Sequence, residues 1–229
     1  MTARKGEQFF FFVGLLLTVI VIAGFLPPIF NRPAGTGSLP LLYQAHGMVL
    51  LSWFVLFCLQ ARLVQAQNLT LHRALGKTSL ALAGTMIILS YFMIRAAYAN
   101  PEFGIGGNSP AGSVIYPVTD MVNFTIAFAL AYINRTSGSA HKRLMLLAGI
   151  LMLDPAVARL IETLGAPFPL IPVIELCLFG LLAGYDFLRF KKPHWATTLG
   201  LALFFIALAA KLTLPEQPNW LSFVALAFG

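Results

Sequence analysis

One stretch decides the fold of this chain: residues 141–162, HKRLMLLAGILMLDPAVARLIE. It opens with three residues that are basic or can become so, and it continues as an apolar run long enough to enter a bilayer. Asp154, Arg159 and Glu162 interrupt that run. Ionisable groups in hydrocarbon are costly, so they usually face a protein interior and mark a working site. The stretch therefore predicts a membrane helix bundle with a charged interior.

The composition excludes an ordinary soluble domain. Of the 229 residues, 59% are hydrophobic and only 10% are charged, whereas about 25% of residues are charged in soluble chains. The formal net charge of +7 does not indicate a nucleic-acid partner, because the basic residues lie in short clusters between apolar runs, where membrane topology accounts for them. The expected partners are membrane lipids and, in one alternative below, the subunits of a membrane complex.

Seven apolar runs are each close to the ~20 residues that cross the hydrocarbon core of a bilayer. They cover about residues 9–30, 41–65, 74–97, 113–133, 143–164, 170–190 and 195–214. The backbone groups of a span must be satisfied within the lipid, so all seven are expected to be α-helices. The prediction is one all-α, polytopic membrane domain over residues 1–229, with the short apolar tail 221–229 lying along the interface.

The first run follows a basic start, as in a signal peptide, but it is longer than a typical one and lacks a small-residue cleavage site. It is therefore interpreted as a retained first helix.

The distribution of lysine and arginine predicts the orientation. Eleven of these residues fall on one side of the membrane: Arg4, Lys5, Arg62, Arg73, Lys77, Arg135, Lys142, Arg143, Arg189, Lys191 and Lys192. The opposite half holds four: Arg32, Arg95, Arg159 and Lys211. By the positive-inside rule the N-terminus is predicted to be cytoplasmic and the C-terminus to lie outside.

Polar and charged residues gather in the outer half of the predicted spans. The candidate pocket residues are His46, Arg95, Asp120, Asn123, Asp154, Arg159, Glu162 and Glu175. Pro155 removes a backbone donor and frees the carbonyl of Leu151, so we expect a kink beside Asp154. These charges define either a functional polar pocket or an internal salt-bridge network that holds the helices in register. Lys211 belongs to the same layer, but it lies near a helix end and is expected to snorkel to water.

Two further features are open to more than one interpretation. The loop 98–112, YANPEFGIGGNSPAG, is either a lid over an outward opening or an ordinary connector. His72 and His141 share a membrane level, and they are the candidates for axial haem ligation, which needs histidines that face each other across helices. Contacts with lipid phosphates explain them better than metal binding does. No other cofactor and no metal is predicted, and the chain has no HExxH, GxSxG or CxxC motif.

A set of residues across half the chain resembles a group of uncharacterised bacterial multi-helix membrane proteins. The matching pattern is His46, Trp53, Gln60, the LHRxLG motif at 71–76, the HKRLMLLA motif at 141–148 and Arg159. The resemblance covers about residues 44–162. It supports a bacterial membrane helix bundle and implies no particular chemistry.

Three functions are compatible with these observations. The first is a binding or transport protein with an outward-facing polar pocket for a small molecule, an ion or a proton. In that pocket Asp120 and Asp154 would bind a cation or proton, and Arg95 or Arg159 an anionic group. The second is a non-catalytic accessory subunit of a membrane complex, and the third is a haem b electron-transfer protein. An enzymatic role is not indicated, because no nucleophile–base pair is apparent.

Overall fold

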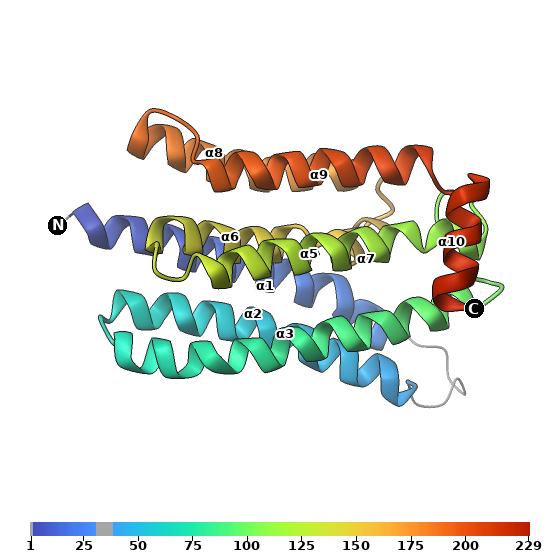
Figure 1. Cartoon of the computed structure of the whole chain (residues 1–229), viewed down its shortest axis with the longest axis horizontal. Helices are drawn as coiled ribbons and strands as arrows, with labels where there is room; N and C mark the ends of the chain where they lie inside the picture. Colours follow the sequence, from blue (N-terminus) through green and yellow to red (C-terminus); the bar gives the residue numbers. More distant parts are fainter. Residues whose placement is uncertain (1, 31–38) are drawn as a thin grey trace.

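The computed structural model of this chain is built from α-helices alone in the part that it describes, residues 2–30 and 39–229 (Figure 1). The side chains described are those of residues 8–27, 30 and 39–229. The helices are α1 (Thr2–Phe30), α2 (Leu41–Gln65), α3 (Leu69–Tyr98), α4 (Pro110–Ser113), α5 (Ile115–Ile133), α6 (Gly138–Ile150), α7 (Asp154–Thr163), α8 (Leu170–Phe190), α9 (Trp195–Thr213) and α10 (Pro218–Phe228). Residues 31–38, between the first two predicted runs, lie outside the described residues.

The predicted polytopic membrane bundle is confirmed. Six helices are long and apolar enough to cross a membrane, and the bent pair α6–α7 raises the number of candidate spans to seven among the described residues. The bounds of α2 and α8 coincide with the predicted runs, and α3 begins five residues before its run. The tail forms α10, which lies across the end of the bundle rather than along it (Figure 1).

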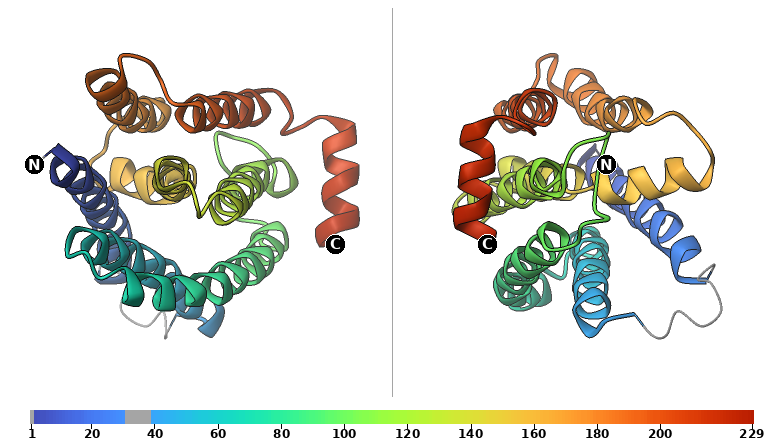
Figure 2. Two further views of the ribbon diagram at one scale, coloured as in Figure 1. Left: turned by 60° about the vertical axis from the view of Figure 1, so that its left-hand side comes forward. Right: turned by 90° about the vertical axis from the view of Figure 1, so that its right-hand side faces the viewer.

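The bundle has a middle layer that contains α5, α6 and α7, with α2 and α3 on one side and α8 and α9 on the other (Figure 2). The turns α2–α3, α5–α6 and α8–α9 lie at the same end as the N-terminus, and α10 lies at the opposite end (Figure 1). Most of the second half of α6 is buried, including Leu146, Leu147 and Ile150. The stretch 141–162 is thus the centre of the fold.

The fifth predicted span is two helices. α6 ends at Ile150, α7 begins at Asp154, and the two axes meet at 43°. Pro155 stands in the first turn of α7, where its missing N–H removes no helical hydrogen bond and its fixed φ suits a helix start. The expected kink beside Asp154 is present.

α1 crosses α7 at a glycine. A methyl group placed on Gly24 would overlap the carbonyl oxygen of Ala156, so the backbones approach more closely than any other residue would allow. Small residues permit such crossings in membranes, where van der Waals packing holds helices together.

A buried ion pair joins α6, α8 and α9 near the N-terminal end. Arg143 and Asp186 are both fully buried, and Arg143 donates to Asp186 Oδ1 from Nε at 2.9 Å and from Nη2 at 2.5 Å. Asp186 Oδ2 accepts from the Thr197 hydroxyl at 2.6 Å and from the backbone N–H of His194 at 2.9 Å. Arg143 Nη1 donates to Ser139. Every charged oxygen and most donors are satisfied, as a buried pair requires.

Replacing Asp186 with Leu should lower the free energy of unfolding by about 3–5 kcal/mol, because Arg143 is then left buried without its counter-charge. The double variant R143L/D186L should recover most of that loss, since the uncompensated charge is gone. Unfolding in mixed detergent micelles measures both. Exposed Glu162 provides the control: E162Q should leave stability unchanged. If D186L were as harmless as E162Q, the pair would have no stabilising role.

His194 caps the N-terminus of α9 in the same region, outside the membrane spans. Its Nδ1 accepts the backbone N–H of Ala196 at 3.2 Å, which requires an unprotonated Nδ1. Burial and the nearby Arg143 lower the pKa of His194, against a smaller raising effect of Asp186. The neutral ring is therefore the native form at neutral pH.

A lowered folded-state pKa means that the unfolded chain binds more protons, so stability falls as pH drops through the unfolded value of about 6.5. The unfolding free energy of the wild type should be lower at pH 5.5 than at pH 7.5. H194N, whose amide oxygen caps the helix without titrating, should show a smaller pH difference. An equal difference in both proteins would contradict the role of His194.

Candidate functional site

A cavity of about 560 Å³ lies in the half of the bundle nearer α10. Residues of α1, α2, α3, α5, α7, α8 and α9 form its wall. Most of the lining residues are apolar or aromatic. The lining includes Met86, Phe124, Phe168 and Phe204. Its size falls within the ~300–1,000 Å³ of small-molecule sites, which are usually apolar with a few placed polar groups.

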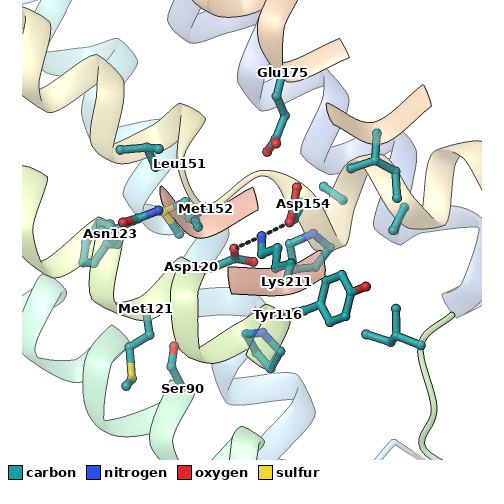
Figure 3. Close-up of a pocket in the computed structure, with 18 of the residues that line it drawn as sticks. Ser90, Tyr116, Asp120, Met121, Asn123, Leu151, Met152, Asp154, Glu175 and Lys211 are labelled. Carbon is teal, nitrogen blue, oxygen red and sulfur yellow. Dashed lines mark hydrogen bonds and ion pairs between the residues drawn. The ribbon is translucent and has the colours of Figure 1, made fainter. Parts of the chain in front are cut away.

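Lys211 of α9 is the centre of the polar part of the wall. Its ammonium group lies 2.8 Å from Asp120 Oδ1 and also contacts Asp154 Oδ2 (Figure 3). The side chains of Lys211, Asp120 and Asp154 are 11%, 9% and 14% exposed, so the cluster is removed from solvent. Because Asp120 belongs to α5 and Asp154 to α7, one lysine links three helices.

The helix break positions Asp154. It is the first residue of α7, where the unpaired N–H groups and the helix dipole favour a negative charge. An unbroken helix would have placed this carboxylate mid-span without that stabilisation. Non-helical backbone at membrane depth is tolerated where it lines a cavity, and the α6–α7 break does so through Leu151, Met152 and Asp154.

Glu175 of α8 completes the cluster. Its carboxyl group points toward Asp154 (Figure 3). Two carboxyl groups that face each other in a buried site do not both ionise, so one of them is expected to carry a proton. With a neutral Glu175, the two aspartates are balanced by Lys211 and by Arg159, which also lines the cavity.

Among the described residues, two polar atoms on the cavity lining have no hydrogen-bond partner. They are Asp120 Oδ2 and His46 Nδ1, both buried. Buried polar atoms are normally satisfied, and each exception needs an explanation such as an unseen water, ion or ligand. Arg159 donates to the Pro155 carbonyl at 3.1 Å and lies over the Phe25 ring at 4.7 Å, which leaves further guanidinium donors available to the cavity.

The structure brings six of the eight predicted pocket residues to one cavity: His46, Asp120, Asn123, Asp154, Arg159 and Glu175. Arg95 and Glu162 are not among the lining residues. Arg95 is exposed and donates to the backbone carbonyl of Gly229 at 3.5 Å, and Glu162 is exposed on α7. Arg95 sits on a face of α3 that turns away from the cavity, and Glu162 lies one turn beyond Arg159, outside the lining. Membership in the same membrane layer could not reveal either position.

Two important residues were not predicted as site residues. Lys211 turns inward instead of snorkelling to water, because the carboxylates of α5 and α7 face it. Tyr116 lies beside it, with its ring centroid 5.8 Å from the lysine Nζ. An excess of carboxylates in the outer layer was the sequence signal for an inward lysine, but only the structure shows which face of α9 carries it.

The loop 98–112 and α10 close the cavity end of the bundle. Phe103 and Ile105 of the loop line the cavity. Glu216, just before α10, accepts from the backbone N–H of Ser109 at 2.8 Å and from its hydroxyl at 2.9 Å. Trp220 of α10 donates to the Ala111 carbonyl at 3.1 Å. The loop is thus fastened to the C-terminal segment.

No protein-family model, curated protein or solved structure matches the chain. Within the described residues, no three of His, Cys, Asp and Glu form a group that could hold a metal ion. The chemistry of the cavity therefore has to be argued from its own residues.

Glu175 and Lys211, the two buried neighbours of Asp154, should respond differently when each is replaced by an uncharged residue. E175Q should change the unfolding free energy by less than about 1 kcal/mol, because glutamine replaces an already neutral carboxyl group. K211M should lower it by about 3–5 kcal/mol, because two buried carboxylates lose their counter-charge. Unfolding in mixed micelles at pH 7 measures both. Equal losses would show that Glu175 is ionised or that Lys211 is not the counter-charge.

Proposed function

We propose that this protein is an integral membrane binding or transport protein for a small, largely apolar molecule with a polar head. The observation that supports this most directly is the cavity of about 560 Å³, apolar over most of its wall, with the Asp120–Lys211–Asp154 cluster on one side. A bare ion would need a shell of oxygen ligands. An apolar wall of this extent instead suits the body of an organic molecule.

The polar head would face the cluster. Asp120 Oδ2 is a free acceptor, so it favours a head that donates a hydrogen bond, such as a hydroxyl or an ammonium group. Arg159 can bind an anionic or carbonyl oxygen on the same molecule. The wall thus offers opposite charges to a ligand that carries both a donor and an acceptor, while the apolar lining binds the rest.

The broken α6–α7 span supports transport in particular. Discontinuous helices that place a helix N-terminus at a mid-membrane site are a recurring device of secondary transporters. Here the N-terminus of α7 carries Asp154 to the cavity. Movement of the α7 segment relative to α6 would change the cluster and the cavity together.

The location we propose is a bacterial inner membrane, with the N-terminus in the cytoplasm. The turns α2–α3, α5–α6 and α8–α9 share one end of the bundle (Figure 1), and the basic clusters of the chain lie in or beside them. The cavity is then in the outward half, as its lining by Phe103 and Phe168 of the opposite loops supports.

Small molecules that the protein retains through purification in mild detergent should identify the ligand. We expect a compound at about one per chain in the wild type, measured by mass spectrometry of an organic extract. S90L should reduce it at least tenfold (about 1.4 kcal/mol) by filling the cavity, because Ser90 lines it (Figure 3). D154N should also reduce it, by weakening the polar contact.

Ser52 provides the matched control, since it is exposed on α2 and outside the lining. S52L should retain the compound at the wild-type level. Identical extracts from wild type, S90L and S52L would contradict a ligand in this cavity. Co-purification of stoichiometric protein partners without a small molecule would favour the accessory-subunit alternative.

A further inference from the structure

A second group of polar side chains lies at the opposite end of the bundle from the cavity. Five buried side-chain atoms in the described part of the chain lack a hydrogen-bond partner, and three of them are here: Gln60 Nε2, Gln60 Oε1 and His72 Nδ1. His72 approaches the backbone of Gln60, and the His141 ring lies beside the His72 ring. An amide with both ends unsatisfied, on a residue whose backbone His72 approaches, indicates an occupant that supplies the missing contacts.

The protonation of His141 follows from its partner. Its Nδ1 lies 2.9 Å from the backbone carbonyl oxygen of Ala131. A carbonyl can only accept, so Nδ1 carries the hydrogen and, in the neutral ring, Nε2 presents a lone pair. A histidine whose other nitrogen donates to a backbone carbonyl is the usual arrangement of a metal ligand, because that bond fixes the ring and its tautomer.

The distance between the two rings fits one metal ion between them. The ring centroids of His72 and His141 are 6.5 Å apart. A metal–nitrogen bond is about 2.0–2.1 Å long, and a ring nitrogen lies about 1.1 Å from its ring centroid. Two imidazoles on opposite sides of an ion therefore have ring centroids roughly 6.3 Å apart. A tetrahedral angle at the metal shortens the distance between the centroids to roughly 5.1 Å. The observed spacing is therefore closer to that of two imidazoles in trans positions than to that of a tetrahedral pair.

We propose that His72, His141 and the side-chain oxygen of Gln60 bind a copper(II) ion. Trans nitrogen ligands with an oxygen donor belong to square-planar or tetragonal sites, which copper(II) prefers, while zinc prefers a tetrahedron. Copper(II) also has the highest affinity among the divalent first-row ions for nitrogen and oxygen ligands.

His72, His141 and Gln60 lie at a position in the bundle that suits a small ion. His72 and His141 are the fourth residues of α3 and α6, so the site lies where helices begin and where water and headgroups can complete the coordination. A haem with the same two axial histidines would need a slot for its macrocycle. Gln60 instead fills the space beside α3, with Nε2 only 3.8 Å from the position of a Cβ on Gly76, one turn beyond His72.

The test adds Cu²⁺ to the purified full chain, removes unbound metal by desalting, and counts metal by mass spectrometry. We expect about one copper per chain, with nitrogen hyperfine coupling in the electron paramagnetic resonance spectrum. H72N and H141N should each weaken binding at least tenfold. Of the other two of the four histidines, His46 lines the cavity and His194 caps α9, so H46N and H194N are matched controls that should retain copper.

Four outcomes would overturn the assignment. Copper retention that is equal in wild type, H72N and H141N would place binding elsewhere, and no retention by the wild type would leave water as the occupant. Zn²⁺ bound more tightly than Cu²⁺ by the same histidines would exclude the trans geometry. A Soret band in the purified protein that H72N abolishes would identify the occupant as haem. The hyperfine spectrum of the wild type tests the ligands even if a variant fails to fold.

Discussion

The contact of Lys211 with Asp120 and Asp154 is the interaction on which the rest of the cavity end depends. Three ionisable side chains that are 9–14% exposed are costly in an apolar bundle, and their mutual neutralisation makes the arrangement tolerable. The contact also fixes α5, α7 and α9 relative to one another. Because membrane helices gain little from burying apolar surface against each other, a specific polar link of this kind can set their register.

The break between α6 and α7 explains why the charges surround a space rather than forming closed pairs. Pro155 starts a new helix at 43° to α6, so Asp154 sits at a helix N-terminus and the following turn diverges from the axis of the span. The Arg143–Asp186 pair at the other end shows the opposite case. There every oxygen of the aspartate is satisfied by protein groups, whereas Asp120 Oδ2 at the cavity is not. One cluster is closed, and the other keeps a hydrogen-bond acceptor without a partner among the described residues.

Much of this fold could be predicted from the sequence, because the length and apolarity of a span are local properties. The bounds of α2 and α8, the kink at Pro155 and the inward position of Asp120 and Asp154 all follow from residues within one helix. The facing of one helix toward another is not local. For that reason the sequence predicts Lys211 at the water edge and Arg95 and Glu162 in the pocket, and it does not indicate that Asp186 is the partner of Arg143.

The central claim is that Lys211 and Asp154 interact directly inside the bundle, and a double-mutant cycle tests it most directly. The unfolding free energies of wild type, K211M, D154N and K211M/D154N would be measured in mixed detergent micelles. A direct buried contact predicts a coupling energy of about 2–3 kcal/mol between the two substitutions. Additive effects, within about 0.5 kcal/mol, would show that the two side chains do not meet and would contradict the account.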